Sequence, residues 1–149
     1  MELRDRIGIE TLERLRASAT VAAQNAYAPY SGFRVGAALL LENGEIVVGC
    51  NVENASFGLT ICAERSAMVQ AIAQYGPQTR LQAVCVVNLN NAASSPCGAC
   101  RQFLAEFAIQ DVPVYFPDAQ GESVQTIGAL LPHGFELRSK RQGHIGSIP

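Results

Sequence analysis

Three cysteines and one glutamate form the strongest chemical pattern in this chain. Cys62-Ala63-Glu64 is followed by the run Cys97-Gly98-Ala99-Cys100, and 34 residues lie between Cys62 and Cys97. Two cysteines three positions apart at the start of a helix place both sulfurs on one face. Three thiolates suit Zn²⁺, which favours four-coordinate tetrahedral sites, and three protein ligands leave one position for water. The pattern therefore predicts one catalytic zinc per chain, held by Cys62, Cys97 and Cys100.

Glu64 lies only two positions after Cys62, a spacing that would separate the two side chains in the middle of a helix. At the first turn of a helix, both can reach a metal that lies just beyond the helix end. The helix N-terminus also carries partial positive charge, which favours a thiolate. We therefore expect Glu64 to be the group that moves protons at the site.

The charge of such a centre requires compensation. Zn²⁺ with three thiolates carries a formal charge of about −1, so the metal acidifies water poorly unless a neighbour withdraws charge from the sulfurs. Arg65 and Arg101 each follow a site residue in the sequence. We favour Arg65, although spacing alone leaves Arg101 open.

Two alternatives use the same cysteines without catalysis. A structural zinc would need a fourth ligand, for which the chain offers Cys50, Cys85, His133 and His144. A Cys-x-x-Cys pair could also be a redox pair, but that reading has no place for a third cysteine next to a glutamate. The combination of Cys-x-Glu with Pro-Cys-x-x-Cys favours the catalytic site. Cys50 and Cys85 lie in apparent strands and are expected to be small buried residues, and the histidines are expected to be non-catalytic.

The remaining pattern predicts an α/β fold, a single-domain mixed β-sheet with helices on both faces. A hairpin turn at 42–45 predicts an antiparallel strand pair, and helical crossovers between the later strands predict parallel ones. We expect helices over 9–27, 62–75, 97–108 and 126–131, and strands over 33–41, 46–52, 81–89 and 112–116. We expect residues 88–96 to form a polar loop.

Composition limits the possible partners and location. The 149 residues are expected to form one domain spanning 1–149, with a loose polar tail from about residue 139. The net charge of −2, without a basic block, argues against nucleic acid. The charged first 16 residues predict no export signal, and the longest apolar run, 35–41, is too short to cross a bilayer. An odd count of five cysteines then favours reduced thiols in the cytoplasm over a disulfide framework.

At these residues the sequence resembles the zinc nucleoside deaminases, and specifically the small homotetrameric cytidine deaminases with three cysteine ligands. Their pattern is His or Cys, any residue, Glu, and later Pro-Cys-x-x-Cys. Three further segments resemble the family in the same order along nearly the whole chain: Tyr27–Leu39, Gly49–Ala55 and Leu130–Phe135. The resemblance implies a cytidine deaminase-like fold, one Zn²⁺ per chain and a homotetramer with shared active sites.

The resemblance also implies roles for individual residues. Asn51 and Glu53 match residues that bind the ribose hydroxyls, and Phe33 matches an aromatic of the base pocket. The backbone of Ala63 and the carboxyl of Glu64 would read the pyrimidine edge. Ala55, Phe57 and Phe135 match segments that reach a neighbouring subunit's site. Phe57 stands where many family members carry tyrosine, so any polar contact of that hydroxyl is lost.

The activity implied is hydrolytic deamination of cytidine and deoxycytidine to uridine and deoxyuridine with release of ammonia, as in pyrimidine salvage. Glu64 would act as both base and acid, which requires a pKa near neutrality. A blasticidin-type antibiotic deaminase shares the zinc motif, but the Asn51 and Glu53 pair favours the nucleoside enzyme. A polynucleotide deaminase is disfavoured by the lack of basic residues.

Overall fold

The computed structural model describes residues 1–137, and the tail expected from about residue 139 lies outside this range. In chain order the elements are the 3₁₀ turn η1 (Leu3–Asp5), α1 (Ile9–Ala23), β1 (Val35–Leu41), β2 (Ile46–Cys50), the 3₁₀ turn η2 (Phe57–Leu59), α2 (Ala63–Tyr75), β3 (Leu81–Asn88), α3 (Gly98–Ala105), β4 (Pro113–Asp118), β5 (Gly121–Thr126) and α4 (Ile127–Leu130). No helix among these residues is long and apolar enough to cross a membrane.

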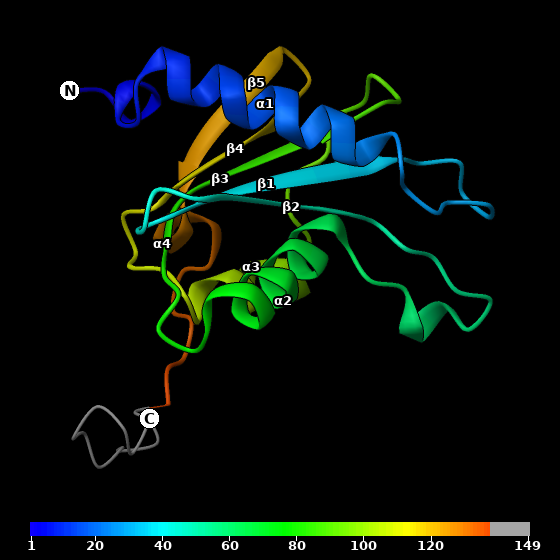
Figure 1. Cartoon of the computed structure of the whole chain (residues 1–149). Coiled ribbons are helices and arrows are strands. Elements are labelled where there is room, and N and C mark those ends of the chain that lie inside the picture. The colour runs from blue at the N-terminus through cyan, green and yellow to red at the C-terminus, as the bar shows by residue number, and fades with distance from the viewer. Residues whose placement is uncertain (138–149) are drawn as a thin grey trace.

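One five-stranded sheet with the order β2-β1-β3-β4-β5 organises the described chain (Figure 1). β1 pairs antiparallel with both β2 and β3, β3 pairs parallel with β4, and β4 pairs antiparallel with β5. The crossover through α3 therefore joins two adjacent parallel strands. The crossover through α2 joins β2 to β3, which run in the same direction with β1 between them. The expected mixed sheet is confirmed.

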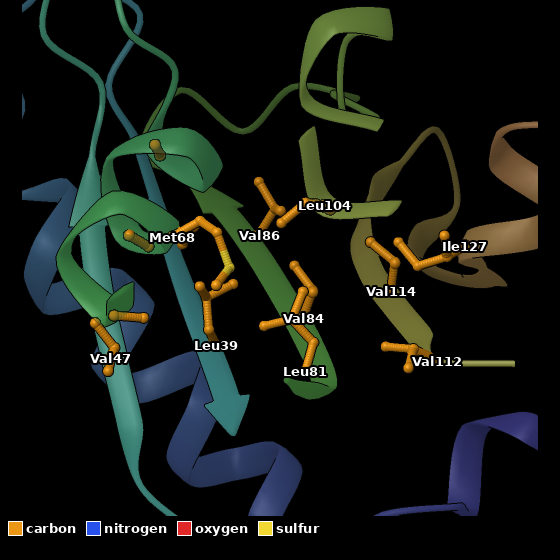
Figure 2. Packing of buried hydrophobic residues seen from close by; sticks show 14 of the residues in the cluster. Leu39, Val47, Met68, Leu81, Val84, Val86, Leu104, Val112, Val114 and Ile127 are labelled. Carbon is orange, nitrogen blue, oxygen red and sulfur yellow. The ribbon is translucent and has the colours of Figure 1, made fainter. Parts of the chain in front are cut away.

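The two faces of the sheet carry different helices (Figure 1). Successive side chains of a strand point to opposite faces. Ala38 and Leu40 of β1 accordingly pack with Leu12 and Leu15 of α1. Ala37, Leu39 and Leu41 face the other layer, which contains α2 and α3. Figure 2 shows the second cluster, where Met68 of α2 lies over Leu39 and Val86. Because both faces are covered, β1 is a nearly continuous apolar strand.

A glycine sets how closely α2 approaches the sheet. A Cβ added at Gly49 of β2 would lie 2.3 Å from Ser66 Oγ and 2.4 Å from the backbone nitrogen of Ala67. Such distances cannot be accommodated without moving backbone, so only glycine permits this contact. The Ser66 hydroxyl donates to the Cys50 carbonyl at 3.0 Å next to it. The first turns of α2 are therefore held against the end of β2.

The structure corrects two expectations. The helix predicted over 9–27 ends at Ala23, because the chain turns there and the Tyr27 N–H donates to the Asn51 carbonyl at 3.0 Å. The strand β5 was not predicted at all. Gly121–Thr126 carries a single apolar residue, Val124, since β5 is an exposed edge strand that buries little surface. The turn before it does carry a sequence signal, with Asp118 and Gly121 at the first and fourth positions.

Candidate active site

The three cysteines of the motif meet at the N-termini of two helices. Cys62 is the N-cap of α2, Cys97 is the N-cap of α3, and Cys100 lies one turn into α3. Their sulfur atoms all lie within 4.8 Å of one another, and the Sγ atoms of Cys62 and Cys97 are 3.7 Å apart. Two ligands at a Zn–S distance of about 2.3 Å in a tetrahedron are separated by about 3.8 Å. The spacing of the sulfurs therefore fits zinc.

The protonation of the thiols gives a second test of that fit. A hydrogen bond from Cys100, supported by one from Arg65, lowers the pKa of Cys62 to about 5. The same hydrogen bond with Cys62, together with burial, raises the pKa of Cys100. Without a cation the sulfurs compete for ionisation, because neighbouring like charges disfavour one another. A divalent cation that all three thiolates share removes this conflict, so the donor set is chemically suited to Zn²⁺.

Arg65 provides a counter-charge at the sulfurs. Its Nη2 lies 3.4 Å from Cys62 Sγ and 3.5 Å from the Thr60 carbonyl oxygen. Its Nε is buried without a hydrogen-bond partner in the part of the chain that the structure describes. Arg101 instead donates to the backbone carbonyls of Pro96 and Leu130, at 2.7 and 3.0 Å. Of the two arginines that the sequence left open, Arg65 is the one in contact with a motif sulfur.

Glu64 follows Cys62 into the first turn of α2 and is only 4% exposed. Burial raises the pKa of its carboxyl group, and the negative charge of Cys62 acts in the same direction. Because a buried carboxylate is costly to ionise, Glu64 can hold a proton closer to neutral pH than a surface glutamate does. A carboxyl group that exchanges a proton near neutrality has the property that general acid–base chemistry needs.

A cavity of about 360 Å³ opens beside these residues. Its walls come from the segment before β1, the end of β2, the start of α2, β3 and the loop before α3. The lining residues are Ser31, Phe33, Val35, Asn51, Glu53, Thr60, Cys62, Ala63, Glu64, Val86, Ser94, Ser95 and Cys97. The cavity has the size of a small-molecule site, with apolar walls and a few polar groups.

Asn51 joins the cavity to the backbone of the segment that enters β1. It is 9% exposed, its Nδ2 donates to the Phe33 carbonyl at 2.8 Å, and its Oδ1 accepts from the Val35 N–H at 2.8 Å. These two bonds use one donor and one acceptor of the amide, and one of each remains. The side chain therefore fixes Phe33 in the cavity wall and still has hydrogen-bonding capacity left.

Glu53 lies two residues further on, past the end of β2. Both Asn51 and Glu53 line the cavity, while the intervening Val52 is 45% exposed. The expected alternation of these three side chains is therefore present, although they lie outside the regular strand. The Ser31 hydroxyl and the backbone N–H groups of Tyr30 and Ser31 donate to the carboxylate of Glu53, and these bonds lower its pKa.

Comparison with known proteins agrees with this geometry. A family model described as the cytidine and deoxycytidylate deaminase zinc-binding region matches residues 9–116. The chain belongs to this deaminase family. A cytidine deaminase of Sporosarcina psychrophila is 44% identical over 125 residues, which cover 83% of this chain and 90% of the relative. One from Mycobacterium tuberculosis is 45% identical over 123 residues, which cover 83% of this chain and 88% of that one.

Solved structures of deaminases share the fold. The crystal structure of cytidine deaminase from Burkholderia pseudomallei matches with a TM-score of 0.74 and 43% identity, covering 83% of this chain and 98% of that chain. That of the enzyme from Mycobacterium leprae matches with a TM-score of 0.72 and 41% identity, covering 82% and 98%. The cytidine deaminase-like fold predicted from the sequence is therefore confirmed, and so are the zinc-dependent deaminase family and its cofactor.

Three residues assigned by resemblance lie outside the cavity of this single chain. Ala55 and Phe57 are exposed on the segment between β2 and α2, where the Phe57 ring meets Tyr30 edge-on with centroids 6.2 Å apart. Phe135 is 59% exposed, beside a separate hollow next to α4.

The described residues that a structural zinc could have used as a fourth ligand, Cys50, Cys85 and His133, are not part of the sulfur cluster. Among the described residues, only Cys62, Cys97 and Cys100 form a group of metal-ligating side chains. Cys85 is buried on the α1 face of the sheet, and His133 is exposed after α4. His144 lies outside the described residues.

Sequence reasoning missed several residues of the cavity wall. Ser31, Val35, Thr60, Val86, Ser94 and Ser95 all line it. Ser94 and Ser95 come directly before the Pro-Cys-x-x-Cys run, and Thr60 lies two residues before Cys62, so proximity to the motif was an available signal. Val35 and Val86 read as ordinary strand residues, and nothing in the sequence distinguishes them.

Proposed function

We propose that this deaminase hydrolyses the exocyclic amino group of free cytidine and deoxycytidine, giving uridine or deoxyuridine and ammonia. The observation that carries the proposal is the buried Glu64 beside three clustered thiols, at the wall of a cavity of about 360 Å³. The relatives named cytidine deaminase at 44 and 45% identity support the same activity.

The reaction needs one group that takes and returns protons within the cavity. Zinc held by Cys62, Cys97 and Cys100 supplies Lewis-acid activation of water. Glu64 takes a proton from the attacking water and delivers a proton to ring N3, which makes C4 electrophilic. A C4–O bond forms, Glu64 takes the remaining proton of the C4 hydroxyl and passes it to the amino group, and the C4–N bond breaks as ammonia leaves and C4 becomes a carbonyl. The Phe33 side chain and the Ala63 backbone hold the base, and the side chains of Asn51 and Glu53 hold the sugar.

The electrostatics of the cavity favour nucleosides over nucleotides. The family description covers deoxycytidylate as well as cytidine deaminases. The lining residues include two carboxylates, Glu53 and Glu64, but neither lysine nor arginine. Among the described residues that line the cavity, a 5′-phosphate would therefore meet negative charge and no lysine or arginine that could pair with it.

A direct assay tests this assignment. The zinc-loaded protein is incubated with cytidine, deoxycytidine and deoxycytidine 5′-phosphate at equal concentrations, and ammonia release is measured together with zinc content. We expect turnover of both nucleosides and little of the nucleotide. A zinc-loaded protein inert toward all three would indicate a structural metal site, and preferential turnover of the nucleotide would reverse the substrate assignment.

We further propose a homotetramer with shared active sites. Several large apolar side chains near the cavity mouth are exposed in the single chain, and clustered exposure of this kind marks interaction surfaces. They are Tyr27, Tyr30, Val52, Phe57, Leu59 and Ile61. In the proposed assembly, Phe135, which is exposed beside α4 in the single chain, reaches the site of a neighbouring subunit.

Phe135→Ala tests the shared site. We expect the Michaelis constant for cytidine to rise about tenfold, because the segment completes a neighbouring site and the variant loses an aromatic contact worth about 1.4 kcal/mol. Steady-state kinetics and the mass in solution by light scattering provide the measurement. An active monomeric parent, or an unchanged Michaelis constant in the variant, would contradict sharing.

Arg65→Gln tests the role of the counter-charge. We expect the variant to keep its zinc and lose about 10- to 100-fold in turnover, the usual effect of removing a partner of the metal ligands. The acid limb of the pH–rate profile should move to higher pH, because the attacking water is harder to deprotonate beside more negative thiolates. Turnover against pH at saturating cytidine gives the answer, with exposed Arg14→Gln on α1 as control. Overlapping pH–rate profiles of parent and Arg65→Gln would show that Arg65 does not act as a counter-charge for the metal centre.

We also propose that the enzyme works in the cytoplasm. All five cysteines are free, and the zinc centre needs three of them reduced. A reducing compartment such as the cytoplasm suits that requirement. There the reaction would return free cytidine-type nucleosides to the uridine pool, which is a step of pyrimidine salvage.

A further inference from the structure

The carboxylate of Glu53 is held by the loop that precedes β1. Its Oε1 accepts from the backbone N–H groups of Tyr30 and Ser31, at 2.9 and 3.1 Å. Its Oε2 accepts from the Ser31 hydroxyl at 2.5 Å. The backbone N–H of Glu53 also donates to the Tyr27 carbonyl at 2.8 Å, so the side chain and the main chain are tied to the same loop.

Counting lone pairs shows which oxygen is left for a ligand. An ionised carboxylate has about four acceptor positions, two on each oxygen. The two backbone donors fill those of Oε1, whereas the Ser31 hydroxyl fills one of the two on Oε2. Because Glu53 lines the cavity, Oε2 is the atom that can accept one further hydrogen bond from a ligand.

The Ser31 hydroxyl is itself oriented. Its Oγ accepts from the Phe33 backbone N–H at 2.9 Å, which directs its proton toward Glu53. Ser31 is also among the cavity-lining residues. Its hydroxyl is the largest cause of the lowered pKa of Glu53, so it helps to keep the carboxylate in the acceptor-only form.

Resting on the proposed function, we infer that Ser31 is a positioning residue: its hydroxyl fixes Glu53 so that Oε2 accepts a hydrogen bond from a sugar hydroxyl of the nucleoside. Ser31 makes no contribution to the proton transfers, which belong to Glu64 at the start of α2. Ser31→Ala leaves the two backbone donors in place, so the loop keeps most of its attachment while Oε2 loses its restraint.

Kinetics with two substrates separate this role from a general effect on the fold. Parent, Ser31→Ala and Ser31→Thr are compared on cytidine and on 2′,3′-dideoxycytidine, which lacks the 2′- and 3′-hydroxyls and keeps the 5′-hydroxyl. We expect Ser31→Ala to raise the Michaelis constant for cytidine about tenfold, the size of a weakened hydrogen bond to a charged group. The kcat should stay within about twofold, since the chemistry is untouched. Ser31→Thr, which keeps the hydroxyl, should resemble the parent.

The dideoxy substrate gives the decisive comparison. Its kcat/KM should change by less than about twofold in Ser31→Ala, because Glu53 has no 2′- or 3′-hydroxyl to bind. Ser18→Ala on α1, far from the cavity lining, is the matched control, and zinc content is measured for each variant. An equal loss on both substrates, or an unchanged Michaelis constant for cytidine, would overturn the inference and leave the proposed function standing. A zinc-loaded parent inert toward cytidine would overturn the proposed function itself.

Discussion

Glu64→Gln should retain zinc and fold while losing turnover of cytidine by a factor on the order of 10⁴ or more. Removing a general acid or base typically costs about 10²- to 10⁴-fold. Glu64 serves several proton transfers in one cycle, so the loss should lie at or beyond the upper end of that range. Glutamine keeps the shape and can still donate a hydrogen bond, but it cannot exchange the proton. The measurement is kcat for parent and variant, with zinc content and thermal unfolding recorded for both.

The two carboxylates of the cavity explain why Glu53 cannot take over this role. Burial raises the pKa of Glu64, whereas the Ser31 hydroxyl and two backbone donors lower that of Glu53. Because the two pKa values are shifted in opposite directions, Glu64 can carry a proton, whereas Glu53 stays an ionised hydrogen-bond acceptor. Glu106→Gln, an exposed change on the surface beside α3, should leave kcat within about twofold. Activity of Glu64→Gln within tenfold of the parent would remove Glu64 from the proton transfers.

The sequence predicted the chemistry of the site more completely than its shape. Cys62 and Glu64 lie together at the start of α2, and Cys97 and Cys100 lie together at the start of α3. Local spacing alone therefore places each pair at a helix N-terminus. The order of the strands depends on long-range pairing that no local pattern contains. β1 therefore separates β2 from β3 in a way that the sequence could not show.

The sugar side of the cavity shows where local reasoning ends. Asn51 and Glu53 were assigned from the family pattern as ligands of the ribose, and this assignment remains a prediction. The structure adds that both side chains also bond the segment 30–35, which lies about 20 residues earlier in the chain. This second role, holding segment 30–35 in place, depends on tertiary contacts that the sequence does not show. The role expected for Phe135 is harder still to predict from the sequence, because it depends on a contact with another subunit.

Cys100→Ala and Cys85→Ala form a pair that tests the metal centre directly. Both cysteines are fully buried, yet they lie in different environments. Cys100 shares its hydrogen bond with Cys62 at the helix ends, while Cys85 packs between β3 and α1 on the opposite face of the sheet. Burial raises the pKa of the Cys85 thiol to about 12, and Cys85 is not in the group of sulfurs that Cys62, Cys97 and Cys100 form.

We therefore expect opposite results from two chemically identical changes. Cys100→Ala should reduce the bound zinc to below about a tenth of an equivalent after dialysis and abolish turnover, since losing a ligand costs more than the 10- to 100-fold in affinity that an outer partner costs. Cys85→Ala should keep one zinc and nearly full turnover, at about 1 kcal/mol of stability for the lost packing. Zinc per chain by atomic absorption and thermal unfolding are measured for both. Loss of zinc from Cys85→Ala would mean a four-cysteine structural site, because a catalytic centre with an open position has no use for a sulfur on the far side of the sheet.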